Sequence, residues 1–498
     1  MVRLIFAQIM SEEIFKKVVS HAKEYGFVFP SSEIYDGLGA VYDYGQNGVE
    51  LKNNLRQYWW KAMVQMHENI VGLEAAIFMH PKTWKASGHI DGFSDPMIDN
   101  KDSKKRYRAD QLLEDKITRY EKDGKTNKAE ELQAAFNSAL LNNNLVELKA
   151  LIEQHEIACP VSGTKNWTDV RQFNLMFSTE MGAMAEDADK IYLRPETAQG
   201  IFVNFLNVQK SGRMKIPFGI AQTGKAFRNE IIARQFIMRM REFEQMEMQF
   251  FIRPGTQKQW YEYWKIKRLN WHKKLGLGED NYRFHDHVKL AHYADAAVDI
   301  EFKYPFGFKE MEGIHSRTDF DLRNHQEFSG KKMQYFDAEL DENGKPYGNY
   351  IPYVIETSIG LDRLFLATLC ASYKEEEVGE DDKKDTRVVL ALPSILAPYK
   401  VAIFPLTKKD GLPEVAREIM DGLKLDYNCF YEEKDAIGKR YRRQDALGTP
   451  FCITIDHESL ENRTVTIRYR DTMKQERIPI EKIREILAEE ISWKKLLV

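Results

Sequence analysis

Cysteine and long apolar runs are both scarce in this chain, and each absence excludes a class of protein. The 498 residues include four cysteines, no two of them close in sequence: Cys159, Cys370, Cys429 and Cys452. This pattern excludes a disulfide framework and a zinc knuckle of the CxxC type. No segment approaches the roughly 18 uninterrupted apolar residues of a membrane span, and the apolar start "MVRLIFAQIM" meets polar residues too soon for a signal peptide. We therefore expect a cytoplasmic protein without a membrane segment.

The composition is that of an ordinary globular protein. Hydrophobic residues make up 43% of the chain and charged residues 30%, with a formal net charge of −4. The net charge does not decide whether nucleic acid is a partner, because a basic face can exist on a nearly neutral protein. At this length the chain has room for two to four domains of roughly 100–200 residues each.

Changes of pattern along the chain predict an α+β protein in two main parts. Residues 1–372 predict a catalytic domain whose strands, between 190 and 370, form an antiparallel sheet flanked by helices. A charged stretch at about 100–157 predicts a helical insertion in it. Residues 373–390 are expected to be an exposed linker or, alternatively, a surface loop within one domain. In 391–498 strands and helices alternate, which predicts a small α/β domain with a mixed sheet.

One stretch, "GKAFRNEIIARQFIMRMREFEQMEMQFF" at 224–251, combines charged and apolar residues in an unusual way. If its second half is a strand, alternate side chains share a face. One face would carry Arg241, Phe243, Gln245 and Glu247. The other would carry Glu242, Glu244, Met246 and Met248. Neither face is purely apolar, so the stretch is either an ion-pair ladder on a large sheet or a pocket wall for a ligand with an anion, a cation and an aromatic ring.

Several motifs resemble the class II aminoacyl-tRNA synthetases. The segment "AFRNE" at 226–230, with Phe243 and Glu247 after a loop, resembles their motif 2, and "IETSIGLDRLFLA" at 355–367 resembles motif 3. The segment "FMHPKTWKASGH" at 78–89 resembles motif 1, which implies that Pro81 lies at a dimer interface.

Three further segments are more particular. "HIDGFSDPM" at 89–97, "YLRPETAQG" at 192–200 and "GIHSRTDFDL" at 313–322 resemble glycyl-tRNA synthetases of the homodimeric type. The resemblance extends from about residue 27 to the C-terminus, and the last domain is similar to the anticodon-binding domain of these enzymes. It implies a ligase that activates glycine with ATP and transfers it to the 3′ end of tRNA(Gly). A rival interpretation is an accessory subunit on the same scaffold that binds nucleic acid without activating an amino acid.

The resemblance implies an ATP site with two catalytic arginines. Arg228 would contact the α-phosphate, and Arg363 would cover the adenine or reach the γ-phosphate. Glu230 would accept a hydrogen bond from the adenine amine, Phe243 would stack on the ring, and Glu310 would hold Mg²⁺ together with ATP. The whole implied ATP-binding set is Arg228, Asn229, Glu230, Met238, Arg239, Met240, Arg241, Glu242, Phe243, Glu310, Met311, Gly360, Leu361, Asp362 and Arg363. Structural ion pairs are the alternative for the arginines, and a solvated acidic pair is the alternative for Glu310 with Glu312.

The substrate glycine offers only an ammonium, a carboxylate and two α-hydrogens, so acceptors and steric bulk must recognise it. The implied glycine-binding set is Arg108, Glu196, Phe243, Glu244, Gln245, Met246, Glu247, Glu356, Thr357, Ser358, Ile359 and Gly360. Glu356 and Ser358 replace glycines of the general motif 3, which fits a pocket filled from its floor. For Arg108 the alternative is an arginine that merely starts a helix of the insertion.

A basic octamer, "GKRYRRQD" at 438–445, lies in the C-terminal domain. Basic side chains next to an aromatic ring suit single-stranded RNA. The implied anticodon contacts are Lys439, Arg440, Arg442 and Arg443, and the alternative is a solvated basic helix. Many relatives have paired cysteines near the position of Cys159, whereas this chain has one, so we expect no zinc.

Overall fold

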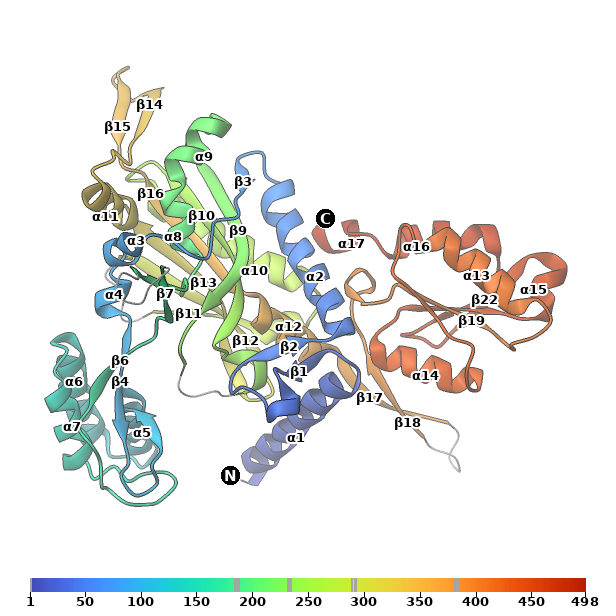
Figure 1. Cartoon of the computed structure of the whole chain (residues 1–498), viewed down its shortest axis with the longest axis horizontal. Helices are drawn as coiled ribbons and strands as arrows, with labels where there is room; N and C mark the ends of the chain where they lie inside the picture. The colour runs from blue at the N-terminus through green and yellow to red at the C-terminus, as the bar shows by residue number, and fades with distance from the viewer. Residues whose placement is uncertain (1, 183–188, 231–234, 288–289, 291–292, 380–384) are drawn as a thin grey trace.

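A seven-stranded sheet forms the centre of the molecule (Figure 1). The computed structural model describes residues 2–182, 189–230, 235–287, 290, 293–379 and 385–498. The strand order is β11-β12-β13-β16-β10-β9-β3, and every neighbouring pair is antiparallel except β3 with β9. The strands are β3 (Ile70–Gly72), β9 (Phe218–Phe227), β10 (Glu242–Ile252), β11 (Tyr282–Asp286), β12 (Ala296–Tyr304), β13 (Gly307–Thr318) and β16 (Tyr353–Gly360). The predicted antiparallel sheet is therefore confirmed.

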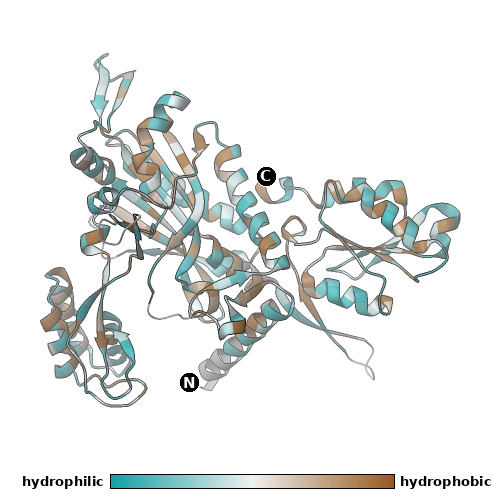
Figure 2. Ribbon diagram, viewed as in Figure 1, coloured by the Kyte–Doolittle hydropathy of each residue, from teal (hydrophilic) through white to brown (hydrophobic). Residues whose placement is uncertain are grey.

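Helices cover the two faces of this sheet differently. The first face carries α2 (Gln46–Trp60), α10 (Gln257–Lys274) and α12 (Leu361–Ser372), and with them it encloses a core that includes Met246, Met248 and Ile359. The other face carries α8 (Ala198–Val203), α9 (Phe205–Gly212) and α11 (Phe320–Ser329), which pack only over its apolar end. Figure 2 shows hydrophobic residues concentrated along the strands. The uncovered polar part of the second face is the candidate site.

The insertion has its own hydrophobic core and is larger than predicted. Its helices are α5 (Ala109–Lys122), α6 (Thr126–Leu141) and α7 (Leu145–Gln154), which confirms helix in the predicted range of 100–157. A three-stranded sheet of β4 (Ser94–Asp99), β5 (Arg106–Arg108) and β6 (Arg171–Asn174) completes the unit. The core runs from Ile98 to Val170, so both predicted boundaries were too narrow. The flanking strands lie far apart in sequence, and a local pattern cannot show that they pair.

The C-terminal domain has the predicted mixed sheet, with strand order β20-β19-β21-β22-β23. Its strands are β19 (Val401–Pro405), β20 (Cys429–Tyr431), β21 (Phe451–Ile455), β22 (Thr464–Tyr469) and β23 (Gln475–Pro479). Its helices are α13 (Leu412–Leu423), α14 (Ile437–Leu447), α15 (His457–Asn462), α16 (Ile483–Glu490) and α17 (Lys494–Leu497). The last helix returns to the catalytic domain, where Leu496 joins the main core.

The predicted exposed linker at 373–390 is not a loop. The strands β17 (Tyr373–Val378) and β18 (Asp385–Leu390) pair as an antiparallel hairpin, and residues 380–384 of that prediction lie outside the described residues. Arg387 of β18 is only 1% exposed, and its guanidinium contacts Glu376 and Asp445, each at 2.8 Å. The acidic composition suggested a solvated segment, but the charges are paired across the hairpin and with α14.

The remaining α-helices and strands include the 23-residue helix α1. They are the helices α1 (Val2–Glu24), α3 (Pro81–Ala86) and α4 (His89–Gly92), and the strand pairs β1 (Val28–Pro30) with β2 (Tyr42–Tyr44), β7 (Ser178–Met181) with β8 (Asp189–Tyr192), and β14 (Tyr335–Leu340) with β15 (Pro346–Tyr350). None of the described helices combines the length and apolar composition that a membrane crossing requires.

Candidate active site

A cavity of about 210 Å³ opens on the polar face of the sheet, between β10, β16 and the start of α12. Its walls contain twelve residues predicted for the ATP and glycine sites and one, Ile237, that was not predicted. The twelve are Arg228, Glu230, Met238, Arg239, Met240, Phe243, Gln245, Glu310, Ser358, Gly360, Asp362 and Arg363. Motifs 2 and 3 thus meet in space because β10 and β16 are paired neighbours.

Three arginines line this cavity, and the contacts of Arg228 and Arg363 fix the positions of two of them. The guanidinium carbon of Arg228 is 5.2 Å from the centre of the Phe243 ring, and its Nε donates to the carbonyl oxygen of Pro195 at 3.0 Å. On another wall, Arg363 Nη1 is 3.0 Å from a carboxylate oxygen of Glu310. The charge of Arg363, which outweighs burial, lowers the pKa of the Glu310 carboxyl group. The cavity therefore presents three guanidinium groups, the ionised carboxylate of Glu310 and an aromatic ring.

Three carboxylates lie beside the cavity: Glu247 and Glu356, which are buried, and Glu196, which is half-buried. The register of the sheet explains how Glu247 and Glu356 come together. Glu356 on β16 is paired with Gln249 on β10 and His315 on β13. Gln249 Nε2 donates to Glu247 Oε1 and to Glu356 Oε2, both at 2.7 Å. We call these three carboxylates the acidic pocket.

Basic neighbours favour the ionised form of two of the three carboxylates. Burial opposes ionisation of Glu356, but Arg317 Nη1 at 3.0 Å and His315 Nδ1 at 2.8 Å outweigh it and lower its pKa. Burial likewise opposes ionisation of Glu196, but nearby His89 helps to bring its pKa down to about 2.

Glu247 behaves in the opposite way. Burial raises its pKa well above the usual value, and the negative charges of Glu356 and Glu196 add to the effect, although Thr197 donates a hydrogen bond to its carboxyl group. The protonated form of Glu247 is therefore favoured in this structure. A small ammonium ion placed among the three carboxylates would favour its ionised form.

Alternation along the strands corrects part of the predicted glycine set. Met246, Thr357 and Ile359 are completely buried on the core face of the sheet. Glu244 also points to that face, where Arg56 and Lys52 bind its carboxylate. Their side chains cannot contact a ligand in the cavity, because successive residues of a strand point to opposite faces. The prediction included every residue of each motif, although only alternate residues of a strand face the cavity.

Five residues of the predicted ATP set do not line the cavity. Leu361 and Met311 belong to the hydrophobic core. Arg241 donates to the carbonyl oxygens of Glu230 and Gly39, and Glu242 pairs with Lys225. The backbone N–H of Asn229 donates to Leu175. The contacts of Asn229, Arg241 and Glu242 hold the motif 2 segment in place.

The acidic pair expected around Glu310 is split by a β-bulge. The pairing of β12 with β13 shifts by one residue between Ile300 and Glu301, which leaves Met311 without a partner. Glu310 therefore faces the cavity, whereas Glu312 is completely buried on the core side, 2.6 Å from both Arg268 Nε and His272 Nε2. A regular strand would have placed both glutamates on one face, and no local pattern in this segment indicates the bulge.

Arg108, predicted near glycine, lies in β5 of the insertion and does not line the cavity. Its guanidinium is bound by Asp110 at 2.6 Å and Asp95 at 3.1 Å. Burial alone would lower its pKa, but these two carboxylates raise it. In this structure the arginine therefore ties the first helix of the insertion to β4.

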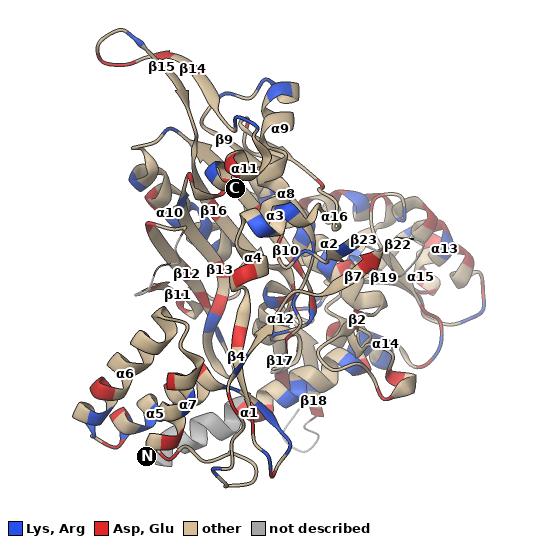
Figure 3. Ribbon diagram, turned by 60° about the vertical axis from the view of Figure 1, so that its left-hand side comes forward, with Lys and Arg blue, Asp and Glu red and all other residues tan. Residues whose placement is uncertain are grey.

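Basic residues lie on α14 (Figure 3), and the predicted anticodon residues of this helix differ in exposure. Arg440 is 2% exposed and donates to the carbonyl oxygens of Pro405, Leu406 and Glu432, so it stabilises the domain and is not available to RNA. Lys439 is exposed. Arg442 and Arg443 are half-buried and form ion pairs with acidic residues nearby.

Sequence reasoning gave no role to several residues of the acidic pocket. They are His89, Thr197, Gln249, His315 and Arg317. A signal existed for two of them, because the segment at 313–322 carries part of the family resemblance and its alternating residues 313, 315 and 317 share a strand face. Recognising their contacts required the register between β13 and β16.

Comparisons with known proteins agree with this geometry. A family model of the class II tRNA synthetase core domain (G, H, P, S and T) matches residues 177–373, and one of an anticodon-binding domain matches 400–490. A prolyl-tRNA synthetase from Cryptosporidium parvum has the same fold, with a TM-score of 0.57, 14% identity, and coverage of 96% of this chain and 78% of that one. Fold and site define a class II aminoacyl-tRNA synthetase.

More similar relatives narrow the class. The glycine–tRNA ligase of Chlorobaculum tepidum is 52% identical over 475 residues, which are 95% of this chain and 99% of the relative. That of Macrococcus caseolyticus is 50% identical over 486 residues, 97% of this chain and 100% of the relative. A model of glycyl-tRNA synthetase insertion domain 1 matches residues 95–130 and 123–175. The chain belongs to the glycine–tRNA ligase family.

Proposed function

We propose that this protein joins glycine to tRNA(Gly) in two steps. Glycine and ATP first form glycyl-adenylate and pyrophosphate, and the terminal ribose 3′-hydroxyl of the tRNA then attacks the activated carbonyl carbon. The observation that carries the proposal is the acidic pocket beside a cavity with three guanidinium groups and an aromatic ring. The acidic pocket suits the ammonium group of an amino acid, and the arginine-lined cavity suits the phosphates of a nucleotide.

In the first step, a carboxylate oxygen of glycine attacks the α-phosphorus of ATP and pyrophosphate leaves. Negative charge develops on the phosphoryl oxygens, so positioning and fixed cations supply most of the catalysis. We assign Arg228 to the α-phosphate, because a planar guanidinium can donate two hydrogen bonds to it. The ring of Phe243 would carry the adenine, Glu230 would accept from its amine, and Arg363 would bind the phosphate tail.

Recognition of glycine follows from charge and space. Its ammonium would lie among Glu196, Glu247 and Glu356, and Ser358 on the adjoining wall is hydrogen-bonded to Gln245 at 3.1 Å. Side chains larger than that of glycine would collide with these groups. A hydrophobic pocket separates substrates that differ by one methylene by only about 1–3 kcal/mol, whereas steric collision is not held to that limit. The smallest amino acid therefore needs no editing site.

Magnesium is the metal that we expect with ATP. The carboxylate of Glu310 lines the cavity, and one protein carboxylate with phosphate oxygens is a common set of ligands for Mg²⁺. Glu310 would hold the ion, which when bound neutralises charge on the phosphates. Glu312 is excluded from this role by its burial beside Arg268.

Our proposals for the remaining partners are supported by membership of the family and by the basic helix α14. We propose that Lys439, Arg442 and Arg443 contact the anticodon arm of the tRNA, since Lys439 is exposed and both arginines are within reach of solvent. We further propose a cytoplasmic homodimer with Pro81 at its interface, supported by the motif 1 resemblance. No side chain is assigned as general base for the transfer step, because a phosphate oxygen can serve.

ATP–pyrophosphate exchange, measured with each proteinogenic amino acid, Mg²⁺ and no tRNA, tests the proposal. Exchange with glycine alone is the expected result, and Glu356→Ala should abolish it. A folded protein that supports no exchange with any amino acid would reject the ligase and favour the accessory subunit. Such a subunit, however, has no need for Arg228, Phe243 and Arg363 around one cavity.

A further inference from the structure

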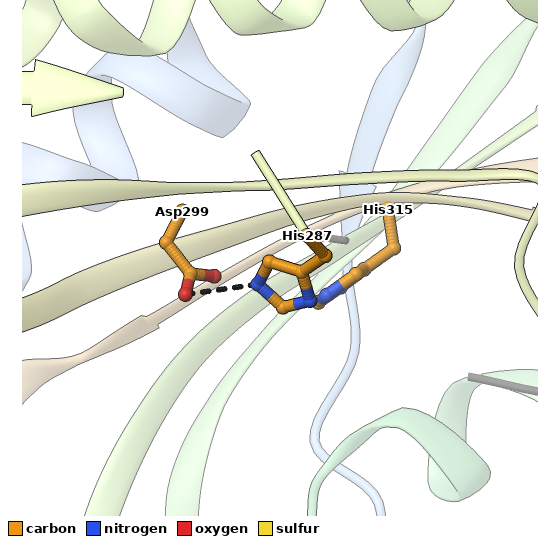
Figure 4. Close-up of side chains that lie close together, drawn as sticks. All are labelled: His287, Asp299 and His315. Atoms are coloured by element: carbon orange, nitrogen blue, oxygen red, sulfur yellow. Dashed lines mark ion pairs between the residues drawn. The ribbon is translucent and has the colours of Figure 1, made fainter. Parts of the chain in front are cut away.

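Two histidines and an aspartate form a cluster beyond the acidic pocket, toward the β11 edge of the sheet (Figure 4). One ligand atom from each of His287, Asp299 and His315 lies within 4.8 Å of the other two. His287 Nε2 is 2.9 Å from Asp299 Oδ2, and the rings of His287 and His315 are 5.8 Å apart at an interplanar angle of 75°. Figure 4 shows the His287 ring between the other two side chains.

The sheet register builds this cluster and leaves room within it. The backbone N–H of His287, just after β11, donates to Ala297 on β12, and Ala297 is in turn paired with His315 on β13. Asp299 is paired with Gly313. The residues between the three donors are thus alanine and glycine, and a Cβ atom at Gly313 would lie only 2.8 Å from Cε1 of His315. Small residues at these two positions allow the side chains to converge.

A carboxylate already orients one of the histidines. Nδ1 of His315 is 2.8 Å from Glu356 Oε1, so Nδ1–H donates to the carboxylate and Nε2 keeps its lone pair. Histidines that bind metals commonly donate their second ring N–H to a carboxylate in this way. The side chains of His287, Asp299 and His315 are 30%, 14% and 17% exposed, so an ion could reach them from solvent.

We propose that His287, Asp299 and His315 bind a divalent transition-metal ion such as Zn²⁺. Two imidazoles and one carboxylate suit such ions, whereas Mg²⁺ prefers oxygen ligands only. On binding, the metal takes the lone pair of His287 Nε2 in place of the hydrogen bond to Asp299; a neutral ring keeps its one proton on Nδ1, and a protonated ring releases its second proton to solvent. The ion joins β11, β12 and β13 and, through His315, fixes the orientation of Glu356. The expectation of no zinc concerned cysteine ligands, and this cluster contains none.

Cobalt(II) is the probe that tests this site, because its visible absorption reports imidazole and carboxylate ligands directly. The full chain is freed of metal with a chelator and titrated with Co²⁺ in the absence of ATP and glycine. We expect one equivalent to bind with a visible absorption band, an equivalent of Zn²⁺ to displace it, and a large excess of Mg²⁺ to leave it in place. The measurement is independent of ligase activity.

Variants locate the ion. His287→Ala, Asp299→Ala and His315→Ala should each weaken Co²⁺ binding at least tenfold, which is about the lower limit for loss of even an outer-shell partner. The exposed neighbour His285 provides the matched control, and His285→Ala should bind as the parent does. Circular dichroism of each metal-free variant verifies folding. If His287→Ala does not fold, His287→Gln takes its place.

Two results would overturn the proposal. One is the absence of saturable Co²⁺ binding by the folded parent protein, which leaves the cluster as a set of ion pairs. The other is binding that Glu310→Gln abolishes while the two histidine variants retain it, which assigns the ion to the nucleotide site.

Discussion

Replacement of Glu356 by glutamine removes one negative charge from the acidic pocket with little change of shape. In the parent protein the carboxylate accepts hydrogen bonds from Gln249, His315 and Arg317. Arg317 keeps a second partner in the variant, because its Nε and Nη2 donate to Asp321 at 2.9 and 3.0 Å. The local fold should therefore survive, and the main loss should fall on the glycine ammonium.

Loss of one partner from a buried charge pair costs about 2–5 kcal/mol. Two other carboxylates, Glu196 and Glu247, remain in the pocket, so we expect the lower part of that range. A loss of about 2–3 kcal/mol corresponds to an increase of roughly 30- to 150-fold in the KM for glycine. The KM for ATP should change by less than about threefold, since the ATP cavity keeps all its lining residues.

The assay is ATP–pyrophosphate exchange at varied glycine concentration, with thermal unfolding measured in parallel. Glu312→Gln is the matched control, because Glu312 is also a buried glutamate of the same sheet with an arginine and a histidine as partners. Its loss leaves Arg268 without a carboxylate and should destabilise the protein by about 3–5 kcal/mol. The KM for glycine should not change, because Glu312 faces the core.

The two variants should therefore separate stability from substrate binding. A Glu356→Gln protein that keeps the KM of the parent for glycine would refute the assignment of the ammonium to the acidic pocket. Equal effects of both variants on this KM would show that the change reflects general destabilisation of the sheet.

Three further predictions concern other charges. Burial first, and then its acidic neighbours, raise the pKa of Glu247. The protonated carboxyl group therefore stabilises the fold fully below about pH 4.3, and this stabilisation is lost as the pH rises through the raised pKa. Because glycine binding needs the ionised form, the KM for glycine should fall over the same pH range, and Glu247→Gln should flatten the plot of this KM against pH. Arg440→Ala should lower the thermal stability by about 3 kcal/mol through the loss of buried hydrogen bonds. Lys439→Ala should leave stability unchanged and reduce by about 1 the slope of the logarithm of the tRNA binding constant against the logarithm of the salt concentration. Equal melting temperatures of the two variants would contradict this contrast. Arg387→Met leaves Asp445 with Arg468 alone and should cost up to about 3–5 kcal/mol, measured by denaturant unfolding, and an unchanged midpoint would show that the hairpin does not support the C-terminal domain.

Local patterns in the sequence were sufficient for the elements and the class. Alternation of strands and helices in 391–498 predicted the α/β domain with its mixed sheet, and alternation along β10 predicted which of its side chains share a face. These signals are local, because a side chain's direction depends on the period of its own element. The resemblance of motifs 2 and 3 likewise assigned Arg228, Phe243 and Arg363 to one site.

Only the tertiary structure decided which charged residues are available to a ligand. The bulge at Met311 directs Glu312 into the core, and the packing of α14 buries Arg440. The ion pairs of Arg387 stabilise a hairpin in the acidic segment that was predicted to be a linker. The deciding contacts lie between different elements of the fold, such as Arg268 with Glu312 and Arg387 with Asp445. Burial and ion pairing are properties of those contacts, since the cost of desolvating a charge depends on what surrounds it and not on its neighbours along the chain.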